Sequence, residues 1–284
     1  DLIGLRSLPG ENGFNFSNMN WARLTNKGFE FSLSTVNIQT KNFKWSMDFN
    51  IAHNKSVINK INVRENSYEP SREGYSVGAV FSLKTAGLDE NGMQMFYNKQ
   101  GQKVSFNEFY QLREGSQMGG FITFLESGLS AEQYRDLYTY EGTTEPKFTG
   151  GWINKFRYRN FDLTIAASFI LDQTVQETPF YNPATTSPGQ NYSNRMFQIW
   201  SPSNPNGKYA RLIGTNTEGE KNWGYQWLQV KDPGNSYRSY DIWFKQMSYM
   251  RINSIRLGYN IPEEIMRKIG FAAARISFES RNPF

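Results

Sequence analysis

The feature that most constrains the fold is a strict alternation of apolar and polar side chains from residue 43 to residue 51. Successive side chains of a β-strand point to opposite faces of a sheet, so the alternation predicts a strand with one apolar and one polar face. Few strands of soluble proteins alternate so cleanly over this length. The apolar set is Phe43, Trp45, Met47, Phe49 and Ile51, and the polar set is Lys44, Ser46, Asp48 and Asn50.

Similar alternation elsewhere predicts three antiparallel hairpins, each with a short connection. In the third hairpin a short helix joins the strands. Pro262 can open this helix, two glutamates suit its positive end, and Gly270 can end it. The predicted strand pairs are 27–38 with 43–53, 150–158 with 161–171, and the two alternating runs of residues 248–281.

Two long stretches, 54–147 and 172–245, lack comparable alternation and are predicted to be loops, as is the segment 1–22. Within the first, Ser130 and Gln133 have the spacing of a capping box, which predicts a helix from Ser130 to about Tyr140. Loops of this length are unusual in a compact domain unless they are functional. Short turns on one side and long loops on the other are typical of an outer-membrane barrel.

Composition narrows the class of protein further. No run of about 18 apolar residues occurs, which excludes a transmembrane helix but leaves a barrel possible, because barrel strands alternate. Only 38% of the residues are hydrophobic, whereas 16% are aromatic. The net charge of +5 is spread along the chain, so no nucleic-acid partner is expected. The absence of cysteine excludes disulfides and thiolate metal sites.

Candidate catalytic and metal-binding residues all have simpler explanations. His53 is the only histidine, so the chain offers no choice of base for a triad and no histidine cluster for a metal. The Asp89-Glu90-Asn91 run lacks the further ligands of a calcium loop and suits a turn. Adjacent Glu263 and Glu264 suit a helix start. We therefore expect no enzymatic activity, no cofactor and no metal site.

Several stretches carry a resemblance to a known family. Residues 247–262 read M-S-Y-M-R-I-N-S-I-R-L-G-Y-N-I-P, and residues 274–282 read A-R-I-S-F-E-S-R-N. Together with N-K-G-F-E-F at residues 26–31, the loop at 87–92, and T-G-G-W-I-N at residues 149–154, they resemble the C-terminal barrel portion of SusC-like (SusC/RagA) TonB-dependent outer-membrane transporters of Bacteroidetes. The matches occur in the order that the family has.

The resemblance implies that residues 1–284 supply about six strands of a 22-stranded antiparallel transmembrane β-barrel with long extracellular loops. Six strands cannot close a barrel, and an open edge in lipid leaves backbone groups unpaired, so we expect a fragment without the plug domain and the closing strand. The first residue, Asp1, indicates either a cleaved leader or a start within a longer protein.

The resemblance also implies a function and partners. The whole protein would be a nutrient importer of the outer membrane that takes up an oligosaccharide or an oligopeptide. Its partners would be a SusD-like surface lipoprotein that acts as a lid, TonB through the missing N-terminal part, the remainder of its own barrel, and outer-membrane lipid. A soluble β-rich carbohydrate-binding module is the alternative, and a glycoside hydrolase is a third hypothesis, for which no pair of carboxylates stands out.

Alternation assigns the strand side chains to two environments, and a slip of one residue would exchange them. Those predicted to face lipid are Trp45, Met47, Phe49, Leu163, Ile165, Ile255, Leu257, Ile276 and Phe278. Those predicted to face the lumen are Lys44, Asp48, Asp162, Arg256, Arg275 and Glu279.

The second long loop holds the predicted contacts with a ligand or the lid. Its rings lie close together in sequence and are flanked by polar groups, a combination that suits sugars, peptides or another protein. Equally, the rings could fold the loop on itself. The candidates are Trp223, Tyr225, Trp227, Tyr237, Tyr240 and Arg238.

Overall fold

The structure is a computed structural model that describes residues 2–7, 11, 13, 16–62, 67–118, 122–183, 186, 189–212 and 236–283. It divides into two compact units. Unit 1 comprises Asp1–Arg23, Ile58–Gly142 and Thr174–Lys245, and unit 2 comprises Leu24–Val57, Thr143–Gln173 and Gln246–Phe284. Among the described residues, no helix has the length and apolar character needed to cross a membrane.

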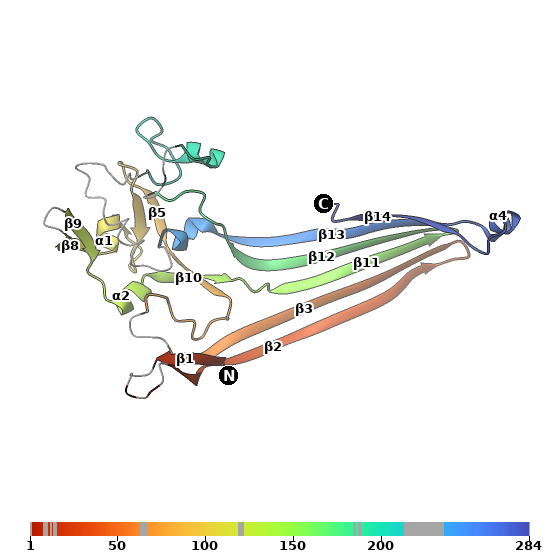
Figure 1. The fold of residues 1–284 in the computed structure, drawn as a ribbon, viewed down its shortest axis with the longest axis horizontal. Coiled ribbons are helices and arrows are strands. Elements are labelled where there is room, and N and C mark those ends of the chain that lie inside the picture. Colours follow the sequence, from red (N-terminus) through yellow and green to blue (C-terminus); the bar gives the residue numbers. More distant parts are fainter. Residues whose placement is uncertain are drawn as a thin grey trace. The chain divides into compact units, whose positions relative to one another are not determined.

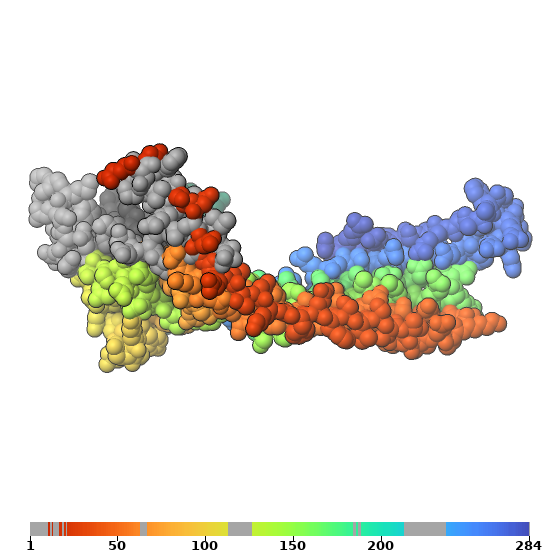
Figure 2. Space-filling view, turned by 90° about the horizontal axis from the view of Figure 1, so that it is seen from below, coloured from red at the N-terminus to blue at the C-terminus, as the bar shows by residue number. Residues whose placement is uncertain are grey.

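Unit 2 is built on the three predicted hairpins. Its long antiparallel strands lie side by side in Figure 1, from orange through green to blue, and Figure 2 shows the same order in space-filling form. The sheet order is β1-β2-β3-β11-β12-β13-β14. The predicted strands are β2 (Phe16–Gln39), β3 (Phe43–Ile61), β11 (Phe148–Tyr158), β12 (Phe161–Gln176), β13 (Phe244–Asn260) and β14 (Arg275–Arg281).

Strand register confirms the alternation. Trp45 of β3 lies opposite Phe156 of β11, which in turn lies opposite Leu163 of β12, and these pairings continue without a shift along the three strands. Leu257 of β13 lies opposite Phe278 of β14 in the same way. Since directly paired residues share a face, the apolar rows of neighbouring strands form one continuous apolar face.

The three short connections lie at one end of the sheet (Figure 1). Arg159 adopts a positive φ of 51°, which closes the tight turn between β11 and β12. The predicted helix after Pro262 is α4 (Glu263–Lys268), with glutamates in its first turn and Arg267 and Lys268 in its last. Gly270 follows with φ of 82°, as expected of a residue just beyond a helix end.

Residues 54–147 are not the loop that the sequence predicts. Strand β3 continues to Ile61, and the described strands between Ala79 and Thr143 form three small sheets. Their strands are short and irregular, so they show too little alternation to be recognised. The elements are β4 (Ala79–Leu83), β5 (Thr85–Leu88), β6 (Gln94–Tyr97), β7 (Lys103–Val104), α1 (Phe106–Phe109), β8 (Leu112–Met118), β9 (Ile122–Ser127), α2 (Ala131–Arg135) and β10 (Tyr138–Thr143).

Two further expectations are corrected. The capping box at Ser130 and Gln133 is confirmed, but α2 ends at Arg135 because Tyr138–Thr143 forms β10, which pairs with β4. Within residues 1–22, β1 (Leu2–Ser7) pairs with Phe16–Ala22 of β2 and adds a seventh strand to the sheet. The short helices η2 (Asn194–Gln198), η3 (Ser236–Ser239) and η4 (Asp241–Trp243) lie in the second predicted loop.

Candidate functional site

The polar face of the unit 2 sheet carries a linked set of side chains. Asp48 of β3 accepts a hydrogen bond from Ser34 of β2 at 2.8 Å and forms an ion pair with Lys155 of β11 at 2.7 Å. Farther along the sheet, Ser168 donates to Asn253 at 3.1 Å. These contacts join side chains from five strands.

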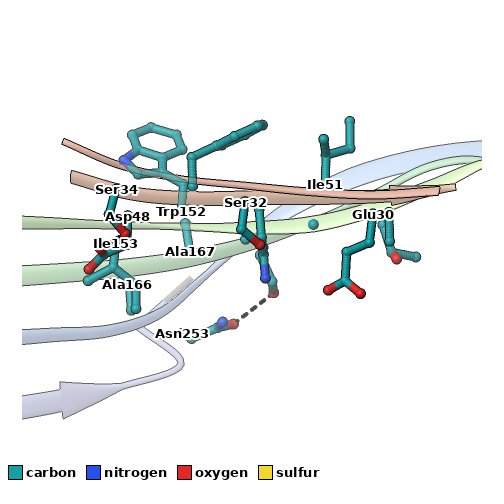
Figure 3. Close-up of a pocket in the computed structure, with 17 residues that line it drawn as sticks. Glu30, Ser32, Ser34, Asp48, Ile51, Trp152, Ile153, Ala166, Ala167 and Asn253 are labelled. Carbon is teal, nitrogen blue, oxygen red and sulfur yellow. Dashed lines mark hydrogen bonds between the residues drawn. The ribbon is translucent and has the colours of Figure 1, made fainter.

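A hollow of about 830 Å³ lies over this polar face. In Figure 3, Glu30, Asp48 and Asn253 point to one side of the strands, while Trp152 and Ile51 point to the other. Small side chains such as Ala166 leave the middle of the polar face open, and hydroxyl, amide and carboxylate groups surround it. Such a surface can hydrogen-bond a polar ligand or stay hydrated, although apolar side chains such as Ile153 also line it.

The predicted lumen-facing residues at the short-turn end also come together. Arg275 of β14 reaches over β13 to Asp162 of β12, at 2.7 Å. The intervening position is Gly258, where an added Cβ would overlap the guanidinium of Arg275. Glycine at this position therefore leaves the path for the ion pair open. Strand register places Arg256 opposite Glu279, and Lys44 opposite Arg157, on the same face.

The opposite face is apolar and rich in aromatic stacks. Trp45 stacks on Phe156 at a centroid distance of 5.9 Å, and Phe49 stacks on Phe169 at 6.1 Å. At the edge formed by β14, Ile276 and Phe278 are 66% and 71% exposed. A soluble sheet would cover aliphatic and aromatic side chains of this size, so their exposure indicates an apolar surrounding. Register places Trp45, Met47, Phe49, Leu163 and Ile165 on one face of β3, β11 and β12. It likewise places Leu257 and Phe278 on one face of β13 and β14.

Two aromatic groups lie near the two ends of the apolar face. Near the short turns, Phe161 of β12 packs on Tyr259 of β13 at 4.5 Å. Near the other end, His53 packs between Phe29 and Phe148 at 5.6 and 5.2 Å, and its Nδ1 lies 2.5 Å from the Lys147 carbonyl. The only histidine of the sequence is thus a packed ring within β3, whereas a strand end was predicted at this position.

Sequence reasoning missed one polar residue on the apolar face. Asn154 lies opposite Met47 and Ile165, and it is 7% exposed. The Trp45 indole donates a hydrogen bond to the Asn154 amide oxygen at 3.0 Å. This bond offsets the cost of placing an amide among apolar side chains. The polar residue at position 154 breaks the alternation of the run that contains Trp152 and Phe156, and this break could have revealed Asn154 from the sequence.

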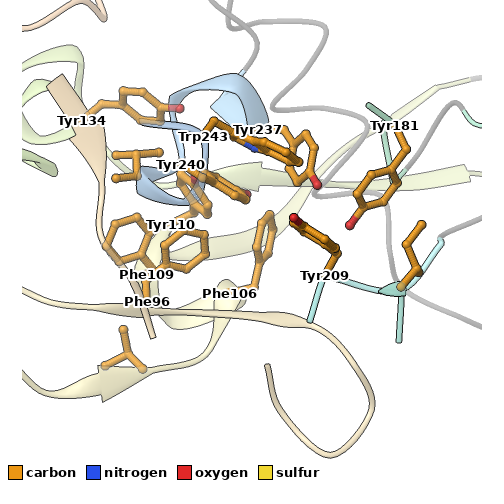
Figure 4. Close-up of a cluster of buried hydrophobic side chains, with 13 residues drawn as sticks. Phe96, Phe106, Phe109, Tyr110, Tyr134, Tyr181, Tyr209, Tyr237, Tyr240 and Trp243 are labelled. Atoms are coloured by element: carbon orange, nitrogen blue, oxygen red, sulfur yellow. The ribbon is translucent and has the colours of Figure 1, made fainter. Parts of the chain in front are cut away.

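The core of unit 1 is a cluster of buried aromatic rings (Figure 4). The predicted ligand-contacting residues Tyr237 and Tyr240 belong to it, at 2% and 1% exposed. Both rings pack against their neighbours, and this replaces the direct contact with a ligand or lid that was predicted for them. Arg238 is exposed. The cluster contains Leu83, Phe96, Val104, Phe106, Phe109, Tyr110, Tyr134, Tyr181, Ile199, Tyr209, Tyr237, Tyr240 and Trp243.

The remaining predicted contacts, Trp223, Tyr225 and Trp227, lie outside the described residues. Trp243 stacks almost parallel on Tyr209 at 5.6 Å, so the rings of this loop do pack on one another. The hypothesis that the aromatic residues fold the loop on itself therefore holds for Tyr237, Tyr240 and Trp243.

A charged cluster joins the two ends of this loop. Glu177 pairs with Lys245 at 2.6 Å and with Arg195 of η2, whose guanidinium also lies 4.5 Å from the Phe180 ring centre. Hydrogen bonding to Lys245, and then to Arg195, lowers the pKa of the Glu177 carboxyl below its ordinary value, and partial burial opposes this shift. In the part of the chain that is described, no cluster of His, Asp or Glu could hold a metal ion.

Comparison with known proteins gives relatives over nearly the whole chain, although no family model matches it. TonB-dependent receptor P3 of Formosa agariphila is 26% identical, over 99% of this chain and 26% of its own length. TonB-dependent receptor SusC of Bacteroides thetaiotaomicron is 25% identical, over 100% of this chain and 25% of its own length. Over nearly its whole length the chain is therefore similar to TonB-dependent receptors, SusC among them. It spans about a quarter of the length of these relatives.

Solved structures give the same fold. The structure of the RagAB peptide transporter matches 98% of this chain and 27% of its own with a TM-score of 0.66, at 18% identity. The RagAB peptide importer in the 'open-open' state matches 100% of this chain with a TM-score of 0.64. The long strands therefore have the fold of a segment of an antiparallel barrel, as expected from the sequence.

Proposed function

We propose that the chain is part of an outer-membrane, TonB-dependent importer of oligosaccharides or oligopeptides. The proposal rests on the two-faced sheet. Along each long strand, apolar side chains that are exposed on one face alternate with polar side chains that form hydrogen bonds on the other. In a membrane barrel the first faces lipid and the second lines an aqueous lumen. The relatives and the barrel fold support this assignment.

The spacing of the aromatic groups supports a membrane setting. Phe43, near the short turns, and His53, near the other end, are ten residues apart on β3. At about 3.3 Å per residue and a tilt of about 40°, ten residues span roughly 25 Å of membrane normal. That is about the height of the apolar band of an outer-membrane barrel, whose borders carry aromatic girdles.

Sidedness follows from the lengths of the connections. Barrels of this class have short periplasmic turns and longer extracellular loops. We infer that residues 39–42, the Arg159-Asn160 turn and the α4 region lie in the periplasm, and that residues 54–147 and 172–245 lie outside the cell. Long connections on a rigid scaffold carry recognition, so the outer segments are where substrate and lid protein would bind.

The proposed partners follow from the family relationship. They are a SusD-like surface lipoprotein, TonB acting through a part of the protein not contained in this chain, the remainder of the barrel, and outer-membrane lipid. RagAB is a peptide transporter, whereas SusC is named only as a receptor, so both substrate classes stay in the proposal. We propose no catalytic role.

Fractionation and uptake together test this function. The whole protein should leave the cell envelope only with detergent, and uptake of its substrate should stop when TonB is deleted. Growth of the wild type and of a deletion strain on a panel of oligopeptides and oligosaccharides then identifies the substrate class. A stable monomer that purifies without detergent would overturn the proposal in favour of the soluble carbohydrate-binding module.

A further inference from the structure

The connection between β13 and β14 exposes three large apolar side chains at the short-turn end of the sheet (Figure 1). Ile265 in α4 is 52% exposed, Ile269 directly after the helix is 59% exposed, and Phe271 is 63% exposed. Met266, by contrast, is 5% exposed and packs against the protein. Three exposed apolar side chains within seven residues form a patch, and such a patch marks a surface that contacts something other than water.

Helix α4 is amphipathic although it is short. At about 100° per residue, Ile265, Met266 and Ile269 fall within one arc of the helix. The charged side chains fall within the opposite arc, where Arg267 pairs with Glu263 at 3.2 Å. Met266 occupies the edge of the apolar arc that is covered by protein, and the two isoleucines occupy the uncovered edge. An apolar arc beside a charged arc is the pattern of helices that lie in the boundary of a membrane.

Strand register connects α4 with the apolar face of the sheet. Tyr259 of β13 lies opposite Ile276 of β14, and its ring packs on Phe161 of β12, so these three residues form the last apolar row before the connection. Beyond this row, the Ile261 amide donates to the Ala274 carbonyl at 3.0 Å. Both residues are two positions from the row, so alternation puts them on the same face. The apolar face therefore continues to the base of α4.

The position of α4 along the membrane normal also suits a lipid boundary. The proposed function places the border of the apolar band near the row that contains Tyr259. Ile261 lies two residues farther, which is about 5 Å of membrane normal at about 3.3 Å per residue and a tilt of about 40°. Interfacial helices bury their apolar side about 5–10 Å deep, where headgroups meet acyl chains. Helix α4 therefore begins at the level of the headgroups.

The size and the charge of this patch favour a lipid leaflet over a protein partner. A stable protein interface takes about 20–30 residues from each side, whereas three large apolar side chains are uncovered here. A leaflet sets no such minimum, because contact with α4 only extends the lipid contact of the sheet. The charged arc includes exposed Glu264 and Lys268. Phospholipid headgroups offer an ammonium group to the carboxylate and a phosphate to the lysine.

We propose that α4 is an interfacial anchor in the periplasmic leaflet of the outer membrane. Ile265, Ile269 and Phe271 lie among the acyl chains of phospholipids, and Lys268 lies at the phosphates, where it stays accessible from the periplasm. This inference rests on the proposed function, which supplies the membrane and puts the short connections on its periplasmic side. The anchor fixes the depth of the β13–β14 hairpin in the membrane.

Spin labels on single cysteines test the anchor in the whole transporter, with every cysteine outside this chain replaced, in nanodiscs of phosphatidylethanolamine and phosphatidylglycerol. Labels at Ile269→Cys and Phe271→Cys should collide several-fold more with oxygen, which concentrates in acyl chains, than with a water-soluble nickel chelate. Glu264→Cys, on the charged arc of the same helix, is the matched control and should give the opposite ratio. Phe278→Cys, on the apolar face of β14, is the reference for a label in lipid.

Two results would overturn the anchor. Labels at residues 269 and 271 that collide mainly with the nickel chelate would place α4 in water, and labels that collide with neither reagent would show that protein covers it. In both cases a lipid-like ratio at Phe278→Cys would leave the proposed function intact. A water-like ratio at Phe278→Cys would overturn the barrel assignment together with the anchor.

Discussion

At the residue scale, one substitution on each face of β12 distinguishes the two environments. Ile165 lies on the apolar face, opposite Asn154 and about midway between the two aromatic groups. An arginine at a lipid-facing position near the midplane costs about 2–4 kcal/mol. Ile165→Arg should therefore lower the thermal stability of the whole transporter in detergent micelles.

Ala166, the next residue, is the matched control because it lines the hollow on the polar face. Ala166→Arg introduces the same charge on the same strand and should cost much less, since the new side chain can reach water. Equal destabilisation by the two variants would show that the faces are wrongly assigned.

Alanine substitutions at two glycines of unit 1 distinguish the effect of backbone strain from the effect of steric overlap. Gly87 and Gly92 both have positive φ, at 80° and 75°, but only at Gly92 would an added Cβ overlap the ring of Trp200. Gly87→Ala should lower the free energy of local opening by about 1 kcal/mol through backbone strain alone. Gly92→Ala should lower it by a further ~1–3 kcal/mol, because overpacking is added. Hydrogen exchange at the amides of Met93 and Arg211 measures both effects, and equal losses would exclude the overlap.

At the element scale, the long strands were predictable and the small ones were not. Each long strand repeats an apolar face over many residues, which fixes its register and leaves a strong pattern. Strands of unit 1 such as Gln94–Tyr97 and Lys103–Val104 are too short to show a period, and packing around Phe96 holds them in place. The helix after Ser130 shows the same limit, since its start is encoded locally by the capping box, whereas its end depends on the pairing of β10 with β4.

In the predicted site, some residue positions follow from the sequence pattern and others depend on tertiary packing. Alternation alone assigns the predicted lumen-facing residues to a face, and the ion pair of Asp162 with Arg275 joins two of them. Burial of Tyr237 and Tyr240 could not be predicted, because aromatic residues serve equally well in a binding surface and in a core. Only their contacts with Phe96, Tyr181 and Trp243 distinguish the two roles.

The Glu177 cluster makes the attachment of η2 dependent on pH. Because Lys245 and Arg195 lower the folded-state pKa of this carboxyl, its contribution to stability is fully present above about pH 4.5, the ordinary value, and is lost as pH falls through the folded-state pKa. Hydrogen-exchange protection of residues 194–199, corrected for the intrinsic rate, should therefore fall in acid. Glu177→Gln should remove this dependence, and the exposed Glu132→Gln should preserve it. A profile unchanged by Glu177→Gln would exclude the cluster as the cause.

At the scale of the whole molecule, we propose a barrel segment whose short connections and long connections lie on opposite sides of the outer membrane. The chain contains no cysteine, so single cysteines can be placed in it without background from its own residues. Asn206 is exposed in the long connection that contains η2, and Lys268 is exposed on α4 in a short one.

Labelling of intact cells with a membrane-impermeant maleimide tests this claim most directly. In the whole transporter, Asn206→Cys should react on intact cells, whereas Lys268→Cys should react only after the outer membrane has been permeabilised. Labelling of Lys268→Cys but not of Asn206→Cys on intact cells would reverse the sidedness, and labelling of neither before the inner membrane is breached would contradict the outer-membrane location itself.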